Sequence, residues 1–173
     1  MIELGTPKDL DELLRLEDLA FTSDKISRQR FQRFLKDNGK KSVLIVSRQW
    51  TTTNIDHPEH NKSKLNGYVL TLHHPLSKVA RIHSYAVDPE SRGLGLGAML
   101  LEAAAMHATC HYKCNAMRTE IRADNPHAIA RYSKSGFKHI GMKANYYSDG
   151  CDSVTYEKPL LQKIRPQFQM TGA

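Results

Sequence analysis

The sequence lacks several features that would place it in well-known classes of protein. No apolar run approaches the roughly 20 residues that a membrane span requires. The first residues, MIELGTPKDL, carry acids and no basic segment ahead of an apolar stretch, so they do not resemble a signal peptide. The 3 cysteines, Cys110, Cys114 and Cys151, are an odd number without a signal, which argues against a disulfide framework. We therefore expect a cytoplasmic protein with reduced thiols and no membrane partner.

Charge is unbalanced, but long runs of one sign are absent. Lys and Arg total 25 against 18 acids, a net charge of +7. This excess fits either an ordinary basic surface or an anionic partner, such as a phosphorylated cofactor, an acidic peptide or RNA. Because no run of five or more Lys or Arg occurs, we do not expect direct binding to nucleic acid. A length of 173 residues, with 40% apolar, suits one domain at 1–160 and a frayed tail at 161–173.

The order of the predicted elements favours a mixed α/β sheet. Apolar periodicity and turn residues predict strands at 2–4, 42–47, 65–72, 80–87, 116–122, 137–143 and 153–158, and helices at 9–21, 27–36, 96–111 and 125–135. Strands joined by short loops are antiparallel, whereas the crossover from 80–87 to 116–122 requires a parallel pair. The polar stretch 48–64 is interpreted as a long, mobile connection in a hairpin. We expect a mostly antiparallel sheet with one central parallel pair and helices on both faces.

A glycine-rich turn between a predicted strand and a predicted helix is the strongest local signal. Arg92 is followed by glycines at alternate positions, Gly93, Gly95 and Gly97. Glycines permit positive φ, so several amides can point at one spot beside the positive end of the helix, which predicts a pyrophosphate site. A Walker loop is excluded because GxxxxGK[ST] is absent. A dinucleotide loop stays open as an alternative, but here the motif lies mid-chain behind Pro89.

The same turn resembles a known cofactor motif. Arg92-x-x-Gly95-x-Gly97, preceded by Val87-Asp88-Pro89, is similar to the acetyl-CoA motif of the GNAT superfamily of N-acetyltransferases. The resemblance implies a GNAT fold over about 2–160 and acetyl-CoA as cosubstrate. It also implies that the pantetheine arm pairs with the strand before the turn and that the turn holds the pyrophosphate. The residues so implied are Tyr85, Ala86, Val87, Arg92, Gly93, Leu94, Gly95, Leu96, Gly97 and Ala98. Gly93 departs from the family, where arginine or another polar residue often stands.

Two side chains are candidates for proton transfer. Amine acetylation needs a base for the amine and an acid for the departing thiolate. Glu120, in strand 116–122, can serve as the base, although the alternation of the strand fits a solvated glutamate equally well. Tyr132 lies about two turns into helix 125–135, and its ordinary pKa of about 10 lies near that of a thiol. The alternative for Tyr132 is a packing tyrosine.

A longer match supports both candidates. The stretch from Thr119 to Phe137, TEIRADNPHAIARYSKSGF, is similar to ribosomal-protein-alanine N-acetyltransferases, the RimI type of GNAT enzyme. That resemblance implies Glu120 as base, Asn125 as a cofactor contact, and Tyr132 as acid and cofactor contact. Two weaker matches accompany it: Ala20-Phe21 is similar to the acceptor-side loop of the same type, and the segment NYYSDGCD at 145–152 is similar to its NYY…DG…D segment.

The implied reaction is acetyl transfer to an amine, which we expect to be a protein N-terminal α-amine, with ribosomal proteins among the candidate acceptors. At pH 7 an α-amine is roughly a tenth neutral, whereas lysine is neutral well under a thousandth of the time. We expect direct transfer in a ternary complex, because no His–Asp arrangement accompanies the cysteines. Lysine or small-molecule amine acceptors, and a non-catalytic acyl-CoA-binding module, stay open as alternatives.

One further pattern is compatible with a metal. Helical spacing places four potential ligands on one face, His107, Cys110, His111 and Cys114. The predicted helix ends inside this set, and its buried face needs some of these side chains as core. We therefore expect packing here and no metal site.

Overall fold

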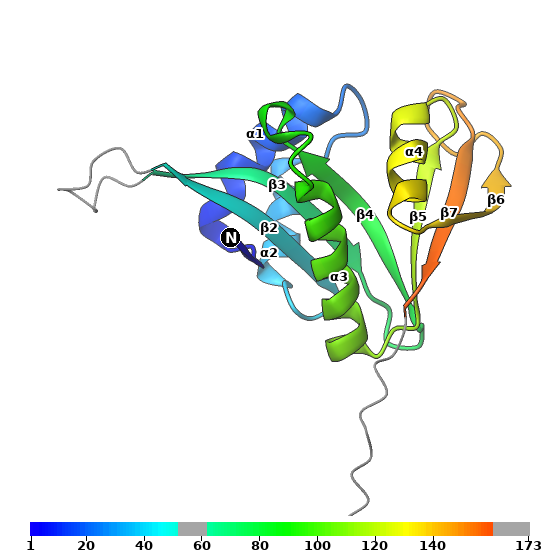
Figure 1. Cartoon of the computed structure of the whole chain (residues 1–173), viewed down its shortest axis with the longest axis horizontal. Coiled ribbons are helices and arrows are strands. Elements are labelled where there is room, and N and C mark those ends of the chain that lie inside the picture. Colours follow the sequence, from blue (N-terminus) through cyan, green and yellow to red (C-terminus); the bar gives the residue numbers. More distant parts are fainter. Residues whose placement is uncertain (52–61, 161–173) are drawn as a thin grey trace, which may run out of the picture.

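The computed structural model describes residues 1–51 and 62–160, which build one seven-stranded sheet (Figure 1). The strands are β1 (Ile2–Leu4), β2 (Ser42–Thr51), β3 (Lys62–Leu72), β4 (Val79–Val87), β5 (Ala116–Arg122), β6 (Lys138–Lys143) and β7 (Ser153–Pro159). Their order across the sheet is β1-β2-β3-β4-β5-β7-β6. Only β4 and β5 run parallel, and every other neighbouring pair is antiparallel. The predicted mixed sheet with one central parallel pair is confirmed.

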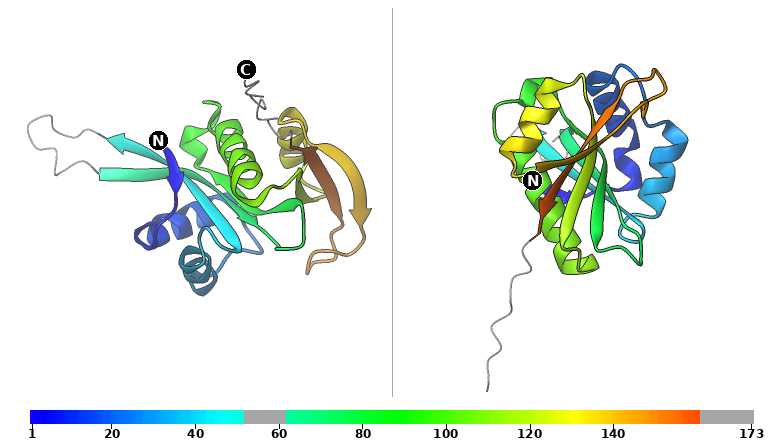
Figure 2. Two further views of the ribbon diagram at one scale, coloured as in Figure 1. Left: turned by 90° about the horizontal axis from the view of Figure 1, so that it is seen from below. Right: turned by 90° about the vertical axis from the view of Figure 1, so that its right-hand side faces the viewer.

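Helices cover both faces of this sheet, as the sequence predicts (Figure 2). The helical elements are η1 (Pro7–Asp9), α1 (Leu10–Ala20), α2 (Arg28–Lys36), η3 (Pro89–Ser91), α3 (Leu96–Tyr112) and α4 (Pro126–Lys134). Helices α1 and α2 lie on one face, and α3 and α4 lie on the other. Within the described ranges no helix has the length and apolarity to cross a bilayer. The expected cytoplasmic location stays a prediction.

Two separate cores explain why the central strands are apolar on both sides. In β2, Val43 and Ile45 pack toward α3, whereas Leu44 and Val46 pack toward α1 and α2. Alternation along a strand sends successive side chains to opposite faces, so a doubly covered strand reads as a continuous apolar run. Each such buried side chain contributes about 1.5–3 kcal/mol relative to exposure.

Both ends of the connection predicted at 48–64 are strand, which corrects the sequence interpretation for those residues. Strand β2 continues to Thr51 and β3 begins at Lys62, and these two residues are paired in register. The prediction failed because this polar stretch offers no apolar alternation, while backbone hydrogen bonds to the partner strand extend the ladder without it. Residues 52–61, also part of that predicted connection, and the predicted tail at 161–173 lie outside the described residues.

The sheet splits between its parallel strands, and this split positions the site. Strands β4 and β5 pair only from Val79↔Ala116 to Ile82↔Thr119. Beyond that point β4 stays with β3 and β5 stays with β7, so the two halves of the sheet separate (Figure 1). A bulge opposite Leu70 and Thr71 leaves His83 without a partner in the β3 register. Because β5 no longer pairs with β4 beyond Ile82, the β5-side edge of residues 83–87 is open. Its backbone groups can bind an extended ligand.

Candidate active site

A cleft of about 1440 Å³ opens where the two halves of the sheet separate. It is lined by the free edge of β4, the glycine-rich turn, the end of β5, α4 and the segment after α1. Nearly all the side chains or backbone positions predicted for the site meet here: Tyr85, Ala86, Val87, Arg92, Gly93, Gly95, Leu96, Gly97, Ala98, Glu120, Asn125 and Tyr132. The exception is Leu94, whose side chain is 77% exposed and does not line the cleft.

The glycines of the turn are required for two different reasons. Gly93 and Gly95 have φ of +81° and +74°, and Gly95 is the N-cap of α3. Gly97 has an ordinary φ, but a Cβ there would lie 2.0 Å from Tyr85 Oη. The first amides of α3 lack intrahelical partners and carry the positive end of the helix dipole. This arrangement fits a diphosphate, and the free edge of β4 beside it fits the extended arm of coenzyme A.

Asp88 anchors the turn to the rest of the molecule. Its Oδ1 accepts a hydrogen bond from the Glu90 amide at 3.1 Å, and its Oδ2 accepts one from Arg15 Nη1 at 2.8 Å. Burial raises the pKa of Asp88, but the hydrogen bonds from Arg15 and the Glu90 amide, with the charges of Lys64 and Arg15, together hold this pKa below its ordinary value. Arg15 also donates to the Leu65 carbonyl at 2.7 Å, so α1, β3 and the turn are held together.

Glu120 is not the solvated glutamate that its strand alternation allows. Its side chain is only 7% exposed, and both carboxylate oxygens are engaged. Arg81 Nε donates to Oε2 at 2.8 Å, and Lys143 Nζ donates to Oε1 at 2.9 Å. Arg81 also donates to the Tyr146 hydroxyl at 2.5 Å. The candidate base is therefore positioned by one cation from the adjacent strand β4 and one from the edge strand β6.

Tyr132 is buried within the α3 and α4 core. Its ring packs edge-on against Phe137, with centroids 5.2 Å apart, and lies 6.1 Å from the Tyr85 ring. Burial raises the pKa of Tyr132 above its ordinary value, although a hydrogen bond with Thr119 lowers it. The pKa of Tyr132 therefore lies above that of a thiol instead of close to it, and the phenol holds its proton at neutral pH.

The two candidates lie on opposite sides of the sheet. Thr119 and Ile121 point toward α3 and α4, where Tyr132 packs, and strand alternation sends Glu120 to the other face. Both side chains nevertheless line the same cleft. Because β4 and β5 no longer pair at this level, the cleft connects the two faces and has one candidate on each side.

Residues from both segments of weaker sequence resemblance also line the cleft. Ala20 and Phe21 approach from the end of α1, and Tyr146 and Tyr147 approach from the turn between β6 and β7. Arg122 holds that turn in place, because Nη2 donates to Asp149 at 2.7 Å and the guanidinium lies 4.8 Å from the Tyr147 ring centroid. Burial raises the pKa of Tyr147 to about 12.

Several cleft residues were missed by sequence reasoning. Arg131 lies over the Tyr85 ring at 5.3 Å and adds a cation to the side that carries the glycine turn. Glu17 is 2% exposed, accepts from the Ile26 amide at 2.7 Å and is hydrogen-bonded by the Tyr68 hydroxyl. Burial raises the pKa of Glu17. Arg131 could have been predicted as a cleft residue because it stands next to Tyr132 in the sequence. Glu17 could not, because in the sequence it resembles any acidic residue on a helix.

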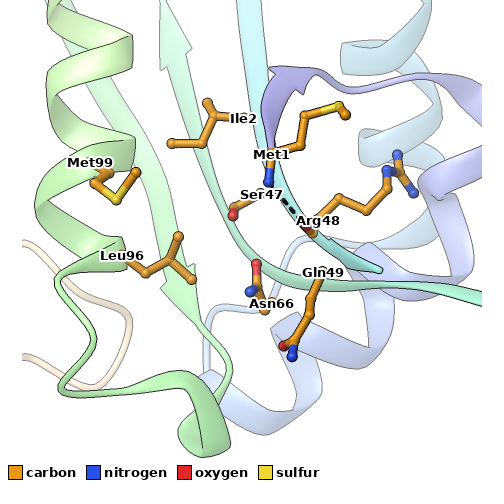
Figure 3. Close-up of a pocket in the computed structure, with 8 residues that line it drawn as sticks. All are labelled: Met1, Ile2, Ser47, Arg48, Gln49, Asn66, Leu96 and Met99. Atoms are coloured by element: carbon orange, nitrogen blue, oxygen red, sulfur yellow. Dashed lines mark hydrogen bonds between the residues drawn. The ribbon is translucent and has the colours of Figure 1, made fainter. Parts of the chain in front are cut away.

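Two features lie away from the cleft. Of the helical His and Cys set, Cys110 is exposed and Cys114 turns inward, with Sγ 3.9 Å from His73 Nδ1. In the part of the chain that the structure describes, no three His, Cys, Asp or Glu side chains converge as metal ligands. A smaller hollow of about 490 Å³ lies between β1, the β2–β3 hairpin and α3, and contains neither Glu120 nor Tyr132 (Figure 3).

Comparisons with known proteins agree with this geometry. The N-alpha-acetyltransferase of Sulfurisphaera tokodaii is 35% identical over 49% of this chain and 51% of its own length, so the chain spans about half the length of such curated relatives. The crystal structure of the ribosomal-protein-S18-alanine N-acetyltransferase from Escherichia coli superimposes with a TM-score of 0.71 at 23% identity, covering 95% of this chain and 98% of that one.

The fold by itself does not select an acceptor. A spermidine N-acetyltransferase chimera from Vibrio cholerae and hSSAT superimposes equally well, with a TM-score of 0.72 at 14% identity over 92% of this chain and 96% of that one. The family match is more direct, because residues 12–137 match the acetyltransferase (GNAT) family. That range includes the glycine turn, Glu120 and Tyr132, and on this evidence the chain belongs to the acetyltransferase (GNAT) family.

Proposed function

We propose that this protein is an acetyl-CoA-dependent N-acetyltransferase that modifies the N-terminal α-amine of a protein or peptide by direct transfer. The observation that carries the proposal is the cleft through the split sheet, with a diphosphate cradle at one end and Glu120 and Tyr132 on its two sides. The donor supplies an acetyl group activated as a thioester. Relatives named for N-terminal acetylation support the choice of acceptor.

Each residue has a distinct task in this proposal. The amides of the glycine turn bind the diphosphate, and the free edge of β4 aligns the arm that leads to the thioester. Glu120 takes the proton from the acceptor ammonium, directly or through water, so that the nitrogen can attack the acetyl carbon. As the carbon–sulfur bond breaks, Tyr132 donates its proton to the leaving sulfur. Burial has kept that proton on the phenol.

The direct test compares acceptors and variants. Peptides with a free α-amine and no lysine are set against N-terminally blocked peptides that contain lysine, each with acetyl-CoA. We expect acetylation of the first kind, because its amine is neutral far more often near pH 7. Exclusive modification of lysine would overturn the choice of acceptor, and acetylation of neither would remove the enzymatic proposal.

The variants test the assignment of the two candidates. Glu120→Gln and Tyr132→Phe should each lower kcat about 100-fold, the usual size of an acid–base contribution, while coenzyme A still raises the Tm of both proteins. Tyr156→Phe, in β7 outside the cleft, serves as the matched control and should keep wild-type kcat. Full activity in Tyr132→Phe would contradict the role of the phenol as acid.

A further inference from the structure

Helix α2 and the turn after it form a cationic surface, which we define by Arg28, Arg30, Arg33, Lys36, Lys40 and Lys41. Between residues 28 and 41 the chain has six Lys and Arg and a single acid, Asp37, so this segment carries most of the net charge of +7. All six cations are exposed. The opposite side of α2 buries Phe31 and Leu35 in the core, so the basic side chains lie on its outer side.

Most of these cations have no internal partner. Arg28 pairs with Asp11 at 2.7 Å, and Arg30 donates to His83 Nε2 at 2.9 Å. Across residues 1–51 and 62–160, no ion pair joins Arg33, Lys36, Lys40 or Lys41 to an acid. Their charge is therefore available to a ligand.

The helix dipole accounts for only part of the charge pattern of α2, because Arg33 and Lys36 in its last turn are favourable whereas the cations in its first turn are not. Acids favour the first turn of a helix and cations oppose it, by about 0.3–1 kcal/mol each. The first turn of α2 contains Arg28 and Arg30 and no acid. Like charges three residues apart, such as Arg30, Arg33 and Lys36, add a further small cost. The stability of the helix therefore does not explain the two arginines in its first turn.

The cationic surface is continuous with the acceptor side of the cleft. Arg30, His83 and Arg81 all line the cleft on the face that carries Glu120. From Arg30 to its last residue, Lys36, the helix continues for about 9 Å, which an extended peptide covers with about three residues. A polypeptide whose amine lies at Glu120 can thus pass Arg30 and run along α2.

We propose that the cationic surface on α2 binds an acidic segment of the acceptor polypeptide, a few residues beyond the amine that is acetylated. This inference rests on the proposed function and adds a substrate class to it: proteins whose N-terminal region is acidic. Charge complementarity of this kind affects mainly encounter and KM, because the chemical step lies elsewhere.

The test uses two peptides with the same first four residues, followed by either acidic residues or their amides. We expect the acidic peptide to have a KM about tenfold lower at low salt, with the difference shrinking as salt screens the charges. Arg33→Gln with Lys36→Gln should abolish the difference and leave kcat unchanged. Lys113→Gln with Lys138→Gln, exposed cations on other surfaces, should preserve it.

The possible failures are distinguishable. Equal KM values for the two peptides, with both acetylated, overturn the acidic segment and leave the proposed function standing. If neither peptide is acetylated, both proposals fail. A single-stranded RNA oligonucleotide and vesicles with anionic lipid are assayed in parallel. If either binds the protein through Arg33 and Lys36 while the peptides do not differ, the surface belongs to that polyanion and the proposal is wrong.

Discussion

Glu120 differs from an ordinary strand glutamate in its neighbours rather than in its position. Arg81 holds one carboxylate oxygen from β4, and Lys143 reaches the other from the edge strand β6. The Lys143 ammonium thus binds Oε1 of Glu120, which the ammonium of the proposed acceptor also has to approach. With Lys143 48% exposed, this ion pair is of the kind that contributes at most about 1 kcal/mol.

A substitution of Lys143 tests this competition. Lys143→Met frees Oε1, so the KM for the acceptor should fall by up to about fivefold while kcat stays near wild type, in proportion to the weak ion pair. Lys138→Met, an exposed lysine on the same strand, is the matched control and should change neither constant. A rise in acceptor KM would show that Lys143 assists binding instead. Steady-state kinetics with a varied peptide gives both values.

Among the structural elements, the glycine turn was predicted well because its signal is local. Glycines before a helix permit positive φ, and Gly93 and Gly95 adopt it, while the diphosphate site itself stays a prediction. The reason for Gly97 was not predictable, since it depends on Tyr85 Oη approaching from β4. Three other features depend on tertiary contacts and were not predictable either. They are the placement of Glu120 and Tyr132 on opposite faces, the extension of β2 to Thr51 and the burial of Glu17.

The Gly97 contact gives a prediction for the turn as an element. Gly97→Ala places a methyl group 2.0 Å from Tyr85 Oη, so the buried ring or the first turn of α3 has to shift. We expect coenzyme A affinity to fall about tenfold, as overpacking of this kind costs roughly 1–3 kcal/mol. Calorimetric titration with coenzyme A measures the change.

A second substitution checks the cause. Gly97→Ala with Tyr85→Phe removes the hydroxyl, and the next atom of the ring lies 3.3 Å from the added methyl carbon, so most of the affinity should return. Tyr85→Phe alone is the control. If the double variant binds as poorly as Gly97→Ala, the loss has another origin, such as the backbone of the helix start.

For the whole molecule, a buried histidine that packs against the C-terminal end of α3 links stability to pH. His73 is 8% exposed, stacks on Tyr112 with centroids 3.8 Å apart and accepts or donates at Thr71 Oγ1 over 2.9 Å. Burial, with a smaller effect from His107, lowers the pKa of His73 from 6.5 to about 4. The unfolded chain therefore binds a proton at this residue that the folded chain excludes between these two values.

This linkage predicts the direction of the pH effect. A depressed histidine pKa leaves stability intact above about pH 6.5 and removes it progressively as the pH falls toward 4. At pH 5 the contribution of His73 should lower the free energy of unfolding by about 2 kcal/mol relative to pH 7. Urea titrations at both values measure it. The pH difference should shrink by about 2 kcal/mol in His73→Gln, and His83 and His107, whose pKa values burial also lowers, keep their share. The exposed His127→Gln should keep the full difference, and equal pH dependence in both variants would contradict the assignment.

The split between β4 and β5 has a consequence for the order in which the two substrates enter and leave. If the donor and the acceptor enter the cleft from opposite faces of the sheet, coenzyme A can leave and acetyl-CoA can bind while the acceptor polypeptide stays at the other opening. A long polypeptide then never has to thread through the molecule, because only its first atoms reach the gap. An enzyme built in this way can work on chains of any length, including those still tethered at their far end.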